Sequence, residues 1–388
     1  MAKNTNVKTA PTVAQLRAQN NSHAALLKRS SPVYRKALSS QTLTSMGQTA
    51  RFKVINSGYI TGFYVSISLV AAIGTATATL SPRAIYGAIS RIRFTDYSQI
   101  DRLNLSGYQL FLRNSVNSFY TGLAGMSLTP SVSSVALGTG GVTSGFTNPN
   151  QTLTVGSPTQ KVTFYVPIAK DMQRGDLRGM IDAENVEGEA YLNIELNSAL
   201  YANGNDDYMF NGAPTTTVTL TSCQIDVVQE FYYPQRVGNV IPRPSLDMRT
   251  VYELAGCQRT TDNLSAGADK TINLMNNRNI RRVYLNYQNN GILGGSSGNE
   301  LAKLKFVIGG ANYIQDLTEQ QQQFIQLQDQ GVTLPKGSYY WEFDHGLETS
   351  SYGIAQLAVT PGGTLVTPYC EVLFENLYSI GSPMSSLL

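Results

Sequence analysis

The chain has little of what many enzymes and secreted proteins use. Among its 388 residues are three cysteines, two histidines and one tryptophan. Cys223, Cys257 and Cys370 form no closely spaced pair, which argues against a disulfide framework or a zinc site and predicts small buried hydrophobes. No apolar run approaches the roughly 20 residues of a membrane-spanning helix. The N-terminus also lacks the apolar segment of a secretory signal, so we expect synthesis in a cytoplasm.

Motifs that carry catalysis or bind cofactors are also missing. The two histidines, His23 and His345, accompany no Ser- or Cys-centred nucleophile motif. The carboxylates of Glu342 and Asp344 have the spacing of a solvated strand face, although a pair of carboxylates also flanks the bond that a glycosidase cleaves. We therefore predict a protein that is not an enzyme and has no catalytic residues, no cofactor and no metal site. A jelly-roll glycosidase is the enzymatic alternative.

Acidic residues are absent from the first quarter of the chain. The first one is Asp96, so residues 1–95 carry twelve Lys and Arg and a net charge of +12. The remaining residues carry 17 basic and 26 acidic side chains, a net charge of −9. This asymmetry predicts that one end of the protein faces an anionic surface.

The basic end begins with a predicted amphipathic helix. Thr12 is its expected N-cap, with Gln15 as the capping-box partner, and Val13, Leu16 and Leu27 fall near one face. This helix either packs on its own domain or forms an arm that docks on a neighbouring subunit, nucleic acid or a membrane surface. The basic residues of the arm are Lys3, Lys8, Arg17, Lys28, Arg29, Arg35 and Lys36.

From residue 48 onward the apolar residues alternate with polar ones, which is typical of half-buried strands. Phe52 and Val54, for example, alternate with Arg51 and Lys53. The same pattern recurs at 61–69, 85–94, 162–166, 190–196 and 218–227, and again at 251–254, 272–274, 283–287, 304–308, 338–343, 352–359 and 368–378. Such antiparallel patterning with little helix predicts β-sandwiches.

Two short helices interrupt the strands. Ser106 is the expected cap of one, which contains the apolar residues Leu110 to Leu112. Thr318 and Gln321 form the capping box of the other. In this second helix we expect one apolar face, made by Ile314, Leu317, Phe324 and Leu327. The stretch 289–300 is a predicted loop, and 121–160 is either an elaborated surface excursion or contains small strands.

Prolines divide the chain near its middle. Pro234, Gly238, Pro242 and Pro244 exclude a central strand and predict an ordered connector. The halves on either side end alike, with GEAYLNIEL and a strand ending in EFYY in the first, and GIAQLAV and a strand ending in ENLY in the second. We therefore predict an all-β fold of two tandem jelly-roll β-sandwiches with a few short helices and an N-terminal amphipathic helix. The expected divisions are an arm at 1–40, a first jelly roll at 41–236, a connector at 237–250 and a second jelly roll at 251–388.

Several segments in order resemble the double jelly-roll major capsid proteins of tailless, membrane-containing icosahedral phages of the tectivirus type. The connector and LPKGSYY are the most telling, because they lie at the matching places between and within the rolls. The segments are VAQLRAQNN (13–21), SGYQLFLRN (106–114), YVPIAKDMQRGDLRGMI (165–181), VGNVIPRPSLDMRTVYEL (237–254) and LPKGSYYWEF (334–343).

The resemblance implies a structural protein of the virion shell, made in the host cytoplasm. Its expected partners are two further copies in a homotrimer with six jelly rolls, neighbouring capsomers, and other virion proteins such as penton and minor membrane proteins. It also implies that the basic arm contacts anionic lipid of an internal membrane. Sequence-specific binding to nucleic acid is not expected. The alternative is a carbohydrate- or receptor-binding tandem β-sandwich of the spike type, although the single tryptophan, Trp341, lies inside a strand pattern.

Overall fold

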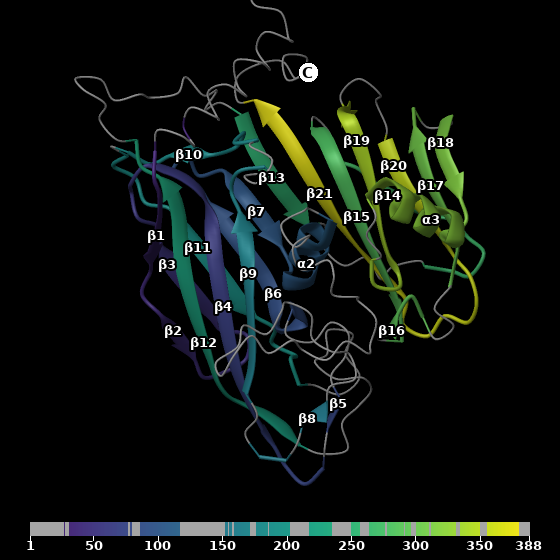
Figure 1. Cartoon of the computed structure of the whole chain (residues 1–388). Coiled ribbons are helices and arrows are strands. Elements are labelled where there is room, and N and C mark those ends of the chain that lie inside the picture. Colours follow the sequence, from purple (N-terminus) through teal and green to yellow (C-terminus); the bar gives the residue numbers. More distant parts are fainter. Residues whose placement is uncertain are drawn as a thin grey trace, which may run out of the picture.

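The computed structural model of the chain is built mainly from β-strands (Figure 1). It describes residues 27, 31–76, 78–79, 86–116, 152–153, 155–156, 159–170, 176–184, 186–201, 217–234, 250–256, 264–275, 278–290, 292–295, 300–309, 312–330, 334–349 and 355–379. Within these ranges the helices are α2 (Gly107–Val116), α3 (Glu319–Gln330) and the 3-10 helix η1 (Tyr86–Ala88). No helix in the described ranges is long and apolar enough to cross a membrane. The predicted N-terminal helix apart from Leu27, most of the loop at 121–160 and residues 237–249 of the predicted connector lie outside these ranges.

The first jelly roll has two facing sheets. One sheet has the order β1-β12-β4, with β2 also paired to β12 and with β9 and β10 both paired to β4. The other has the order β3-β11-β6-β7. The strands of this half are β1 (Val33–Ala37), β2 (Gln41–Leu43), β3 (Thr49–Lys53), β4 (Tyr59–Ile73), β5 (Ala78–Thr79), β6 (Ile89–Thr95), β7 (Asp101–Leu105), β8 (Thr152–Leu153), β9 (Thr159–Pro167), β10 (Ile181–Asp182), β11 (Tyr191–Leu196) and β12 (Val218–Tyr232).

The second jelly roll repeats this plan. One sheet has the order β13-β21-β15, with β19 and β16 paired to β15, and the other has the order β14-β20-β17-β18. The strands are β13 (Thr250–Gly256), β14 (Lys270–Asn273), β15 (Asn279–Asn289), β16 (Ile292–Leu293), β17 (Leu301–Ile308), β18 (Asn312–Leu317), β19 (Ser338–Glu348), β20 (Ala355–Pro361) and β21 (Tyr369–Ser379).

The two rolls have the same strand order. If β1 and β2 count as one position and the two-residue strands β5, β8, β10 and β16 are left out, each roll places its first, eighth, third and sixth strands in one sheet and its second, seventh, fourth and fifth strands in the other. This is the order of a jelly roll, and it recurs without change. The predicted all-β fold with two tandem jelly rolls is therefore confirmed, and so is the predicted likeness between the ends of the two halves.

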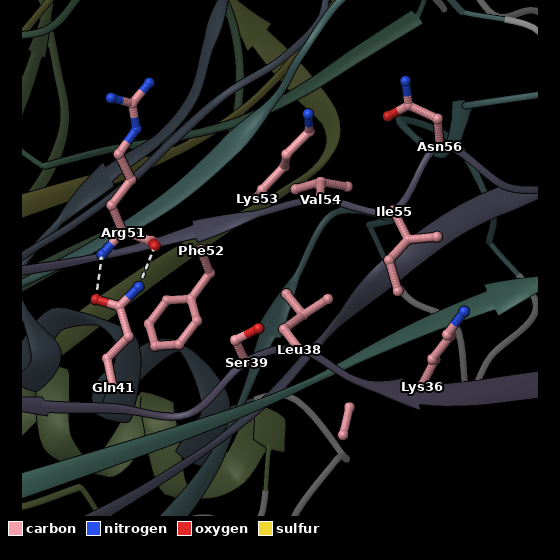
Figure 2. A pocket seen from close by; sticks show the side chains of 11 residues that line it. Lys36, Leu38, Ser39, Gln41, Arg51, Phe52, Lys53, Val54, Ile55 and Asn56 are labelled. Atoms are coloured by element: carbon pink, nitrogen blue, oxygen red, sulfur yellow. Dashed lines mark hydrogen bonds between the residues drawn. The ribbon is translucent and has the colours of Figure 1, made fainter.

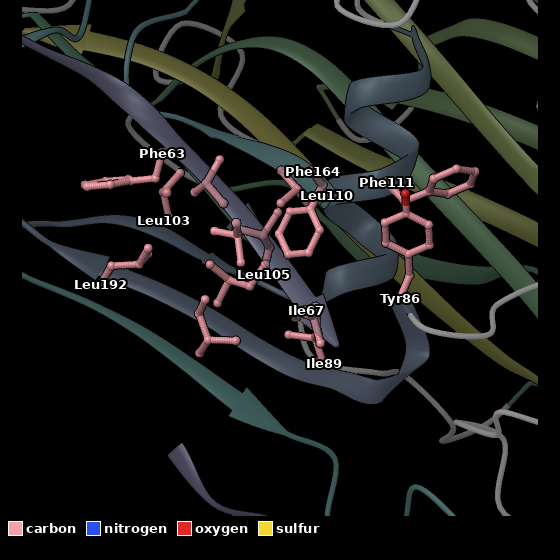
Figure 3. Close-up of a cluster of buried hydrophobic side chains, with 14 of the residues drawn as sticks. Phe63, Ile67, Tyr86, Ile89, Leu103, Leu105, Leu110, Phe111, Phe164 and Leu192 are labelled. Carbon is pink, nitrogen blue, oxygen red and sulfur yellow. The ribbon is translucent and has the colours of Figure 1, made fainter. Parts of the chain in front are cut away.

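Each roll has its own apolar core, formed by the residues that alternate along its strands. In β3 the buried Ala50 and Phe52 alternate with the exposed Arg51 and Lys53. Figure 3 shows the first core, where Phe63 of β4 lies among side chains from the facing sheet. The second core contains Val283, Leu285, Phe306, Leu357 and Phe374. The predicted burial of Cys223 and Cys370 is confirmed, and Cys257 lies outside the described residues.

Helix α2 lies between the two rolls and is buried over its whole length (Figure 1). It begins with a capping box, because the Gln109 N–H donates to Ser106 Oγ (3.2 Å) and the Ser106 N–H donates to Gln109 Oε1 (3.0 Å). Leu110 and Leu112 pack in the first core. The Gln109 side chain donates to the carbonyl of Val372 in β21 (3.2 Å). The helix therefore joins the first roll to the second.

On the second roll, α2 meets the face of β13-β21-β15-β19 that is turned away from the second core. We call this surface the second-roll outer face. Its tyrosines and leucines belong to the same buried cluster as α2: Tyr252, Leu254, Tyr284, Tyr340, Leu373 and Leu377. Strands β7 and β13 also pair in parallel, with Leu103 opposite Leu254, so that one nine-stranded sheet runs through both rolls.

Arg113 of α2 is the charged group at the centre of this joint. It is 2 % exposed, and its guanidinium donates to the Tyr252 hydroxyl (3.0 Å), the Lys170 carbonyl (2.8 Å) and Asn114 Oδ1 (3.1 Å). The negative charge of Glu375 in β21 stabilises this buried cation. Together these groups fix the position of the helix on the second roll.

Glu375 is equally buried and is held in its charged form. Burial favours the neutral carboxyl, but the charges of Arg282, Arg113 and Lys170 outweigh this effect and lower the pKa of Glu375. The Tyr284 hydroxyl also donates to Glu375 Oε2 (3.1 Å), and Arg282 Nη1 lies 3.8 Å from Oε1. The joint is thus a buried network of charges rather than a purely apolar contact.

The segment that follows β9 closes the joint from the side. Arg178 Nη2 and Lys170 Nζ lie 2.6 and 3.4 Å from Asp176 Oδ2, and although burial raises the pKa of Asp176, these two cations lower it to about 2. Gly179 has φ +86°, and a Cβ there would lie 2.2 Å from the Cβ of Tyr252. Only glycine fits this close approach between the rolls.

Helix α3 differs from its prediction. The capping box of Thr318 and Gln321 is present, but Ile314 and Leu317 belong to strand β18, and Phe324 and Leu327 are exposed instead of packed. The buried residues of the helix are polar: Glu319, Gln322 and Gln326. They are buried because β19 offers hydrogen bonds, with Gln322 Nε2 donating to the Tyr340 carbonyl (2.8 Å) and the Tyr340 N–H donating to Gln326 Oε1 (3.0 Å).

We expect Arg113→Met to lower the free energy of unfolding by about 3–5 kcal/mol, because it leaves Glu375 buried with less compensation. The matched control is Arg93→Met, which removes an exposed pair with Asp101 and costs about 1 kcal/mol or less. Chemical denaturation followed by circular dichroism measures both losses. Equal, small losses for the two variants would contradict a structural role for the buried charge.

Candidate functional site

The structure places only part of the predicted basic arm. Lys3, Lys8, Arg17, Lys28 and Arg29 lie outside the described residues. Leu27 is helical and fully buried, in a cluster with Tyr59, Ala169, Leu177, Met180 and Tyr232 of its own first roll. Arg35 and Lys36 lie on β1, which falls within the range predicted for the arm and pairs with β12 of the first roll.

Arg35 and Lys36 point to different places. Arg35 Nε donates to Glu230 Oε2 (2.8 Å), and its guanidinium carbon lies 5.4 Å from the ring centroid of Tyr64. The side chain of Arg35 is 60 % exposed, whereas that of Glu230 is 1 % exposed. The hydrogen bond to Glu230 raises the pKa of Arg35. Arg35 thus neutralises a glutamate that is buried beneath it.

Lys36 lines a groove of about 660 Å³ at the open edge of the first roll, where one sheet ends in β1 and β2 and the other ends in β3 (Figure 2). Figure 2 shows its labelled side chains on both sides of the groove. The lining residues are Lys36, Ala37, Leu38, Ser39, Gln41, Arg51, Phe52, Lys53, Val54, Ile55 and Asn56.

Two glutamine side chains bridge the groove and complete the hydrogen bonds of the edge strand. Gln41 accepts from the Arg51 N–H (3.1 Å) and donates to the Arg51 carbonyl. Gln229 of β12 accepts from the Ile55 N–H (2.8 Å) and donates to the Ile55 carbonyl (2.9 Å). The amides thereby take the place of a neighbouring strand. An edge occupied in this way is a poor template for aggregation.

The other cations of the groove also have partners. The Arg51 guanidinium stacks 3.6 Å from the ring centroid of Tyr191, and Lys53 forms an ion pair with Glu189. These side chains suit contact with an anionic or polar surface. They do not form a catalytic arrangement, because no histidine, cysteine or carboxylate lies among the residues that line the groove to act with Ser39 or the lysines.

Metal-binding and nucleophilic groups do not gather elsewhere in the described part of the chain. No group of three or more His, Cys, Asp or Glu side chains is placed there to hold a metal ion. Burial raises the pKa of both the Cys223 and the Cys370 thiol to about 12, which makes them poor nucleophiles.

Sequence reasoning missed the two most specific features of this region. Gln41 and Gln229 have no neighbouring motif that marks them as bridges, and Arg113 carries no spacing signal that distinguishes a buried arginine from a solvated one. The nearest signal was the excess of glutamine and asparagine in the body of the chain. That composition is compatible with both buried and exposed amides.

We expect Gln229→Leu to destabilise the first roll by about 1–3 kcal/mol for each backbone group of Ile55 that it leaves unpaired. The matched control is Gln224→Leu, because Gln224 is an exposed residue of the same strand that bonds only to Asp226 among the described groups. Hydrogen exchange of the Ile55 amide, together with chemical denaturation, measures the effect. Unchanged protection of Ile55 in the first variant would contradict the bridging role.

The fold is shared with solved viral capsid proteins. The STIV major capsid protein, from Sulfolobus turreted icosahedral virus, superimposes with a TM-score of 0.63 at 13% identity, over 92% of this chain and 99% of that chain. The PBCV-1 virus capsid gives 0.55 at 12% identity over 89% and 93%, and the Faustovirus major capsid protein gives 0.51 at 9% over 89% and 90%. Identities this low show a common fold and nothing more. No curated protein matches the chain.

Family membership rests on a separate match. The family model described as P3 major capsid protein N-terminal covers residues 5–233, which is more than half of the chain and includes the predicted arm and the first roll. The match confirms the resemblance drawn from the sequence motifs. The chain therefore belongs to the P3 major capsid protein family and is a structural protein of the virion shell.

Proposed function

We propose that three copies of the chain form a pseudo-hexagonal capsomer, and that these capsomers build an icosahedral shell over an internal membrane. The observation that carries this proposal is the unchanged strand order of the two rolls, joined through the buried helix α2. Two similar rolls per copy give a threefold oligomer six similar sides, which lets it fill a site with six neighbours. The expected partners are neighbouring capsomers and other virion proteins, including penton and minor membrane proteins.

Assembly requires the two rolls of a copy to keep one orientation. The continuous nine-stranded sheet and the charge network around Arg113 support this requirement. We also propose the divisions given by the sequence with one change, because β1 pairs with β12: an arm at 1–32, rolls at 33–236 and 251–388 and a connector at 237–250. Neither the groove nor the described acidic and thiol groups supply a catalytic arrangement, and this favours a structural role without enzymatic activity.

The basic arm is proposed to contact anionic lipid. Lys3, Lys8, Arg17, Lys28 and Arg29 all precede the first roll, and no acidic residue lies among them to compensate their charge. Many copies in a shell would add their contributions on one surface. Lys36 at the groove and Arg35 at Glu230 belong to the roll itself, and so the proposed lipid contact rests mainly on the other five residues.

We expect the purified chain to be a homotrimer with three times the 42.2 kDa mass of one copy. Size-exclusion chromatography with light scattering measures this mass. The burial of large interfaces on both sides of each copy should keep the trimer intact at micromolar concentration. A stable monomer at that concentration would argue strongly against the proposed capsomer.

For the arm, we expect replacement of Lys3, Lys8 and Arg17 by Gln to weaken binding to phosphatidylserine-containing vesicles roughly a hundredfold, at about 1 kcal/mol per charge. Co-sedimentation with vesicles of phosphatidylcholine, with and without phosphatidylserine, measures the change. The control replaces Arg91, Arg93 and Lys303 of the rolls by Gln and should bind as the unmodified chain does. If both triple variants bind equally well, the arm is not the lipid contact.

A further inference from the structure

The two rolls are alike in their outer side chains as well as in their strand order. The first-roll outer face is the surface of β1-β12-β4-β9 turned away from the first core. In each roll the third strand carries a tyrosine that is paired with a tyrosine on the sixth strand and with an aliphatic residue on the eighth. These trios are Tyr64, Tyr165 and Val228 in the first roll and Tyr284, Tyr340 and Leu373 in the second. The paired tyrosine rings have centroids 5.0 Å apart in the first roll and 6.5 Å apart in the second.

A glutamate and a strand irregularity follow at the same place in both rolls. Glu230 and Glu375 each lie on the eighth strand, two residues after the aliphatic member of the trio. At this point the pairing register shifts in both rolls, so that one residue of the third strand has no partner on the eighth strand. Glu230 and Phe231 pair with Gly62 and Ile60, and Glu375 and Asn376 pair with Arg282 and Ile280. Because both rolls have this irregularity at the same place, each residue of one outer face can be matched with one residue of the other.

Helices α2 and α3 correspond in the same way. Each follows the fifth strand of its roll and begins with a capping box, formed by Ser106 with Gln109 in α2 and by Thr318 with Gln321 in α3. Each then bonds to the backbone of the sixth-strand tyrosine: Asn114 to Tyr165 (2.8 Å), and Gln322 and Gln326 to Tyr340 (2.8 and 3.0 Å). When the caps are aligned, Arg113 corresponds to Ile325 and Leu112 to Phe324.

The two helices differ in what packs on their outer sides. α2 is buried because the second-roll outer face of the same copy lies on it. α3 has no such cover within the described chain, and Phe324 is 65 % exposed, Leu327 49 % and Ile314 of neighbouring β18 50 %. Val33, on the first-roll outer face beside Arg35, is also exposed. An exposed apolar patch on a helix whose equivalent in the other roll is covered by an outer face indicates an interaction surface.

The charges explain which helix fits which face. On the second roll, Glu375 is compensated by Arg282 of the same sheet and by Arg113 from the helix, and the residue opposite it on the first strand is Leu254. On the first roll, Glu230 is compensated by Arg35, which occupies the first-strand position equivalent to Leu254. The helix position equivalent to Arg113 is then Ile325. The first-roll outer face thus carries Arg35 on a strand where the second roll takes part of its compensation from the helix, and it accepts an apolar helix.

We propose that α3 of one copy docks on the first-roll outer face of a second copy, as α2 docks on the second roll of its own copy. Phe324, Ile325 and Leu327 then cover Tyr64 and the Arg35–Glu230 pair. This inference rests on the proposed homotrimer and names the residues that hold it together. Three such contacts close a ring of six rolls, in which every outer face is covered by the helix of the preceding roll.

The compensating cations lie at different positions on the two faces, and this difference provides the test. Arg35→Leu leaves Glu230 without its cation under an apolar helix, and Ile325→Arg brings a second cation onto Arg35. We expect each single variant to raise the dissociation constant of the trimer roughly a hundredfold, since uncompensated buried charge is strongly unfavourable. The double variant Arg35→Leu with Ile325→Arg places a helix cation at the position equivalent to Arg113 and should recover part of the affinity. Mass photometry over a dilution series measures trimer and monomer.

A second pair of variants tests the apolar patch alone. Phe324→Asp should convert the trimer into folded monomers, whereas Val366→Asp, at another exposed apolar residue, should leave the trimer intact. Thermal melting by circular dichroism confirms that each variant is folded. A trimer that is indifferent to Phe324→Asp, or single charge variants whose defects simply add in the double variant, would overturn the docking but not the trimer. An unmodified chain that is itself monomeric would overturn the proposed function.

Discussion

The buried network in which Arg113 donates to Tyr252 and Glu375 accepts from Tyr284 fixes how the two rolls sit against each other. Removing two such ions from water costs several kcal/mol each, and this cost is offset only when the hydrogen-bond partners are in place. An apolar joint tolerates small rotations, because the hydrophobic effect has no direction. A guanidinium that donates to the Tyr252 hydroxyl and to the Lys170 carbonyl does not tolerate them. We interpret the network as a device that sets the orientation of the rolls more than it adds stability.

If α3 docks as proposed, the duplication of the roll creates a problem of selection, since two similar helices must each find one of two similar faces. The placement of cations resolves it. If α2 lay on the first-roll outer face, Arg113 and Arg35 would meet at one glutamate, Glu230. If α3 lay on the second-roll outer face, Ile325 would replace Arg113 and leave Glu375 with only Arg282 and Lys170 as compensating cations. Specificity then arises from the unfavourable wrong pairings as much as from the right ones.

Much of the fold was predictable from the sequence, because strand alternation and helix caps are local signals. The alternation around Phe52 gave β3, and the capping boxes of Ser106 and Thr318 gave both helices. The face of α3 was predicted wrongly, because helical spacing says that Phe324 and Leu327 share a side but not what lies against it. Gln322 and Gln326 are buried through bonds to β19, a long-range contact without a sequence signal. For the same reason Arg35 was grouped with the arm, although its partner Glu230 is distant in sequence.

Helix α3 also shows how a subunit can remain soluble before it assembles. Its glutamines satisfy the backbone of β19 on one side, and Gln320, Gln321 and Gln328 surround the apolar residues on the exposed side. The apolar area of Phe324 and Leu327 is therefore small and bordered by amides, which limits non-specific association. A contact of this kind is weak when made once. In a closed ring each copy makes it twice, once with its helix and once with its first-roll outer face, and the loss of one contact does not release the copy.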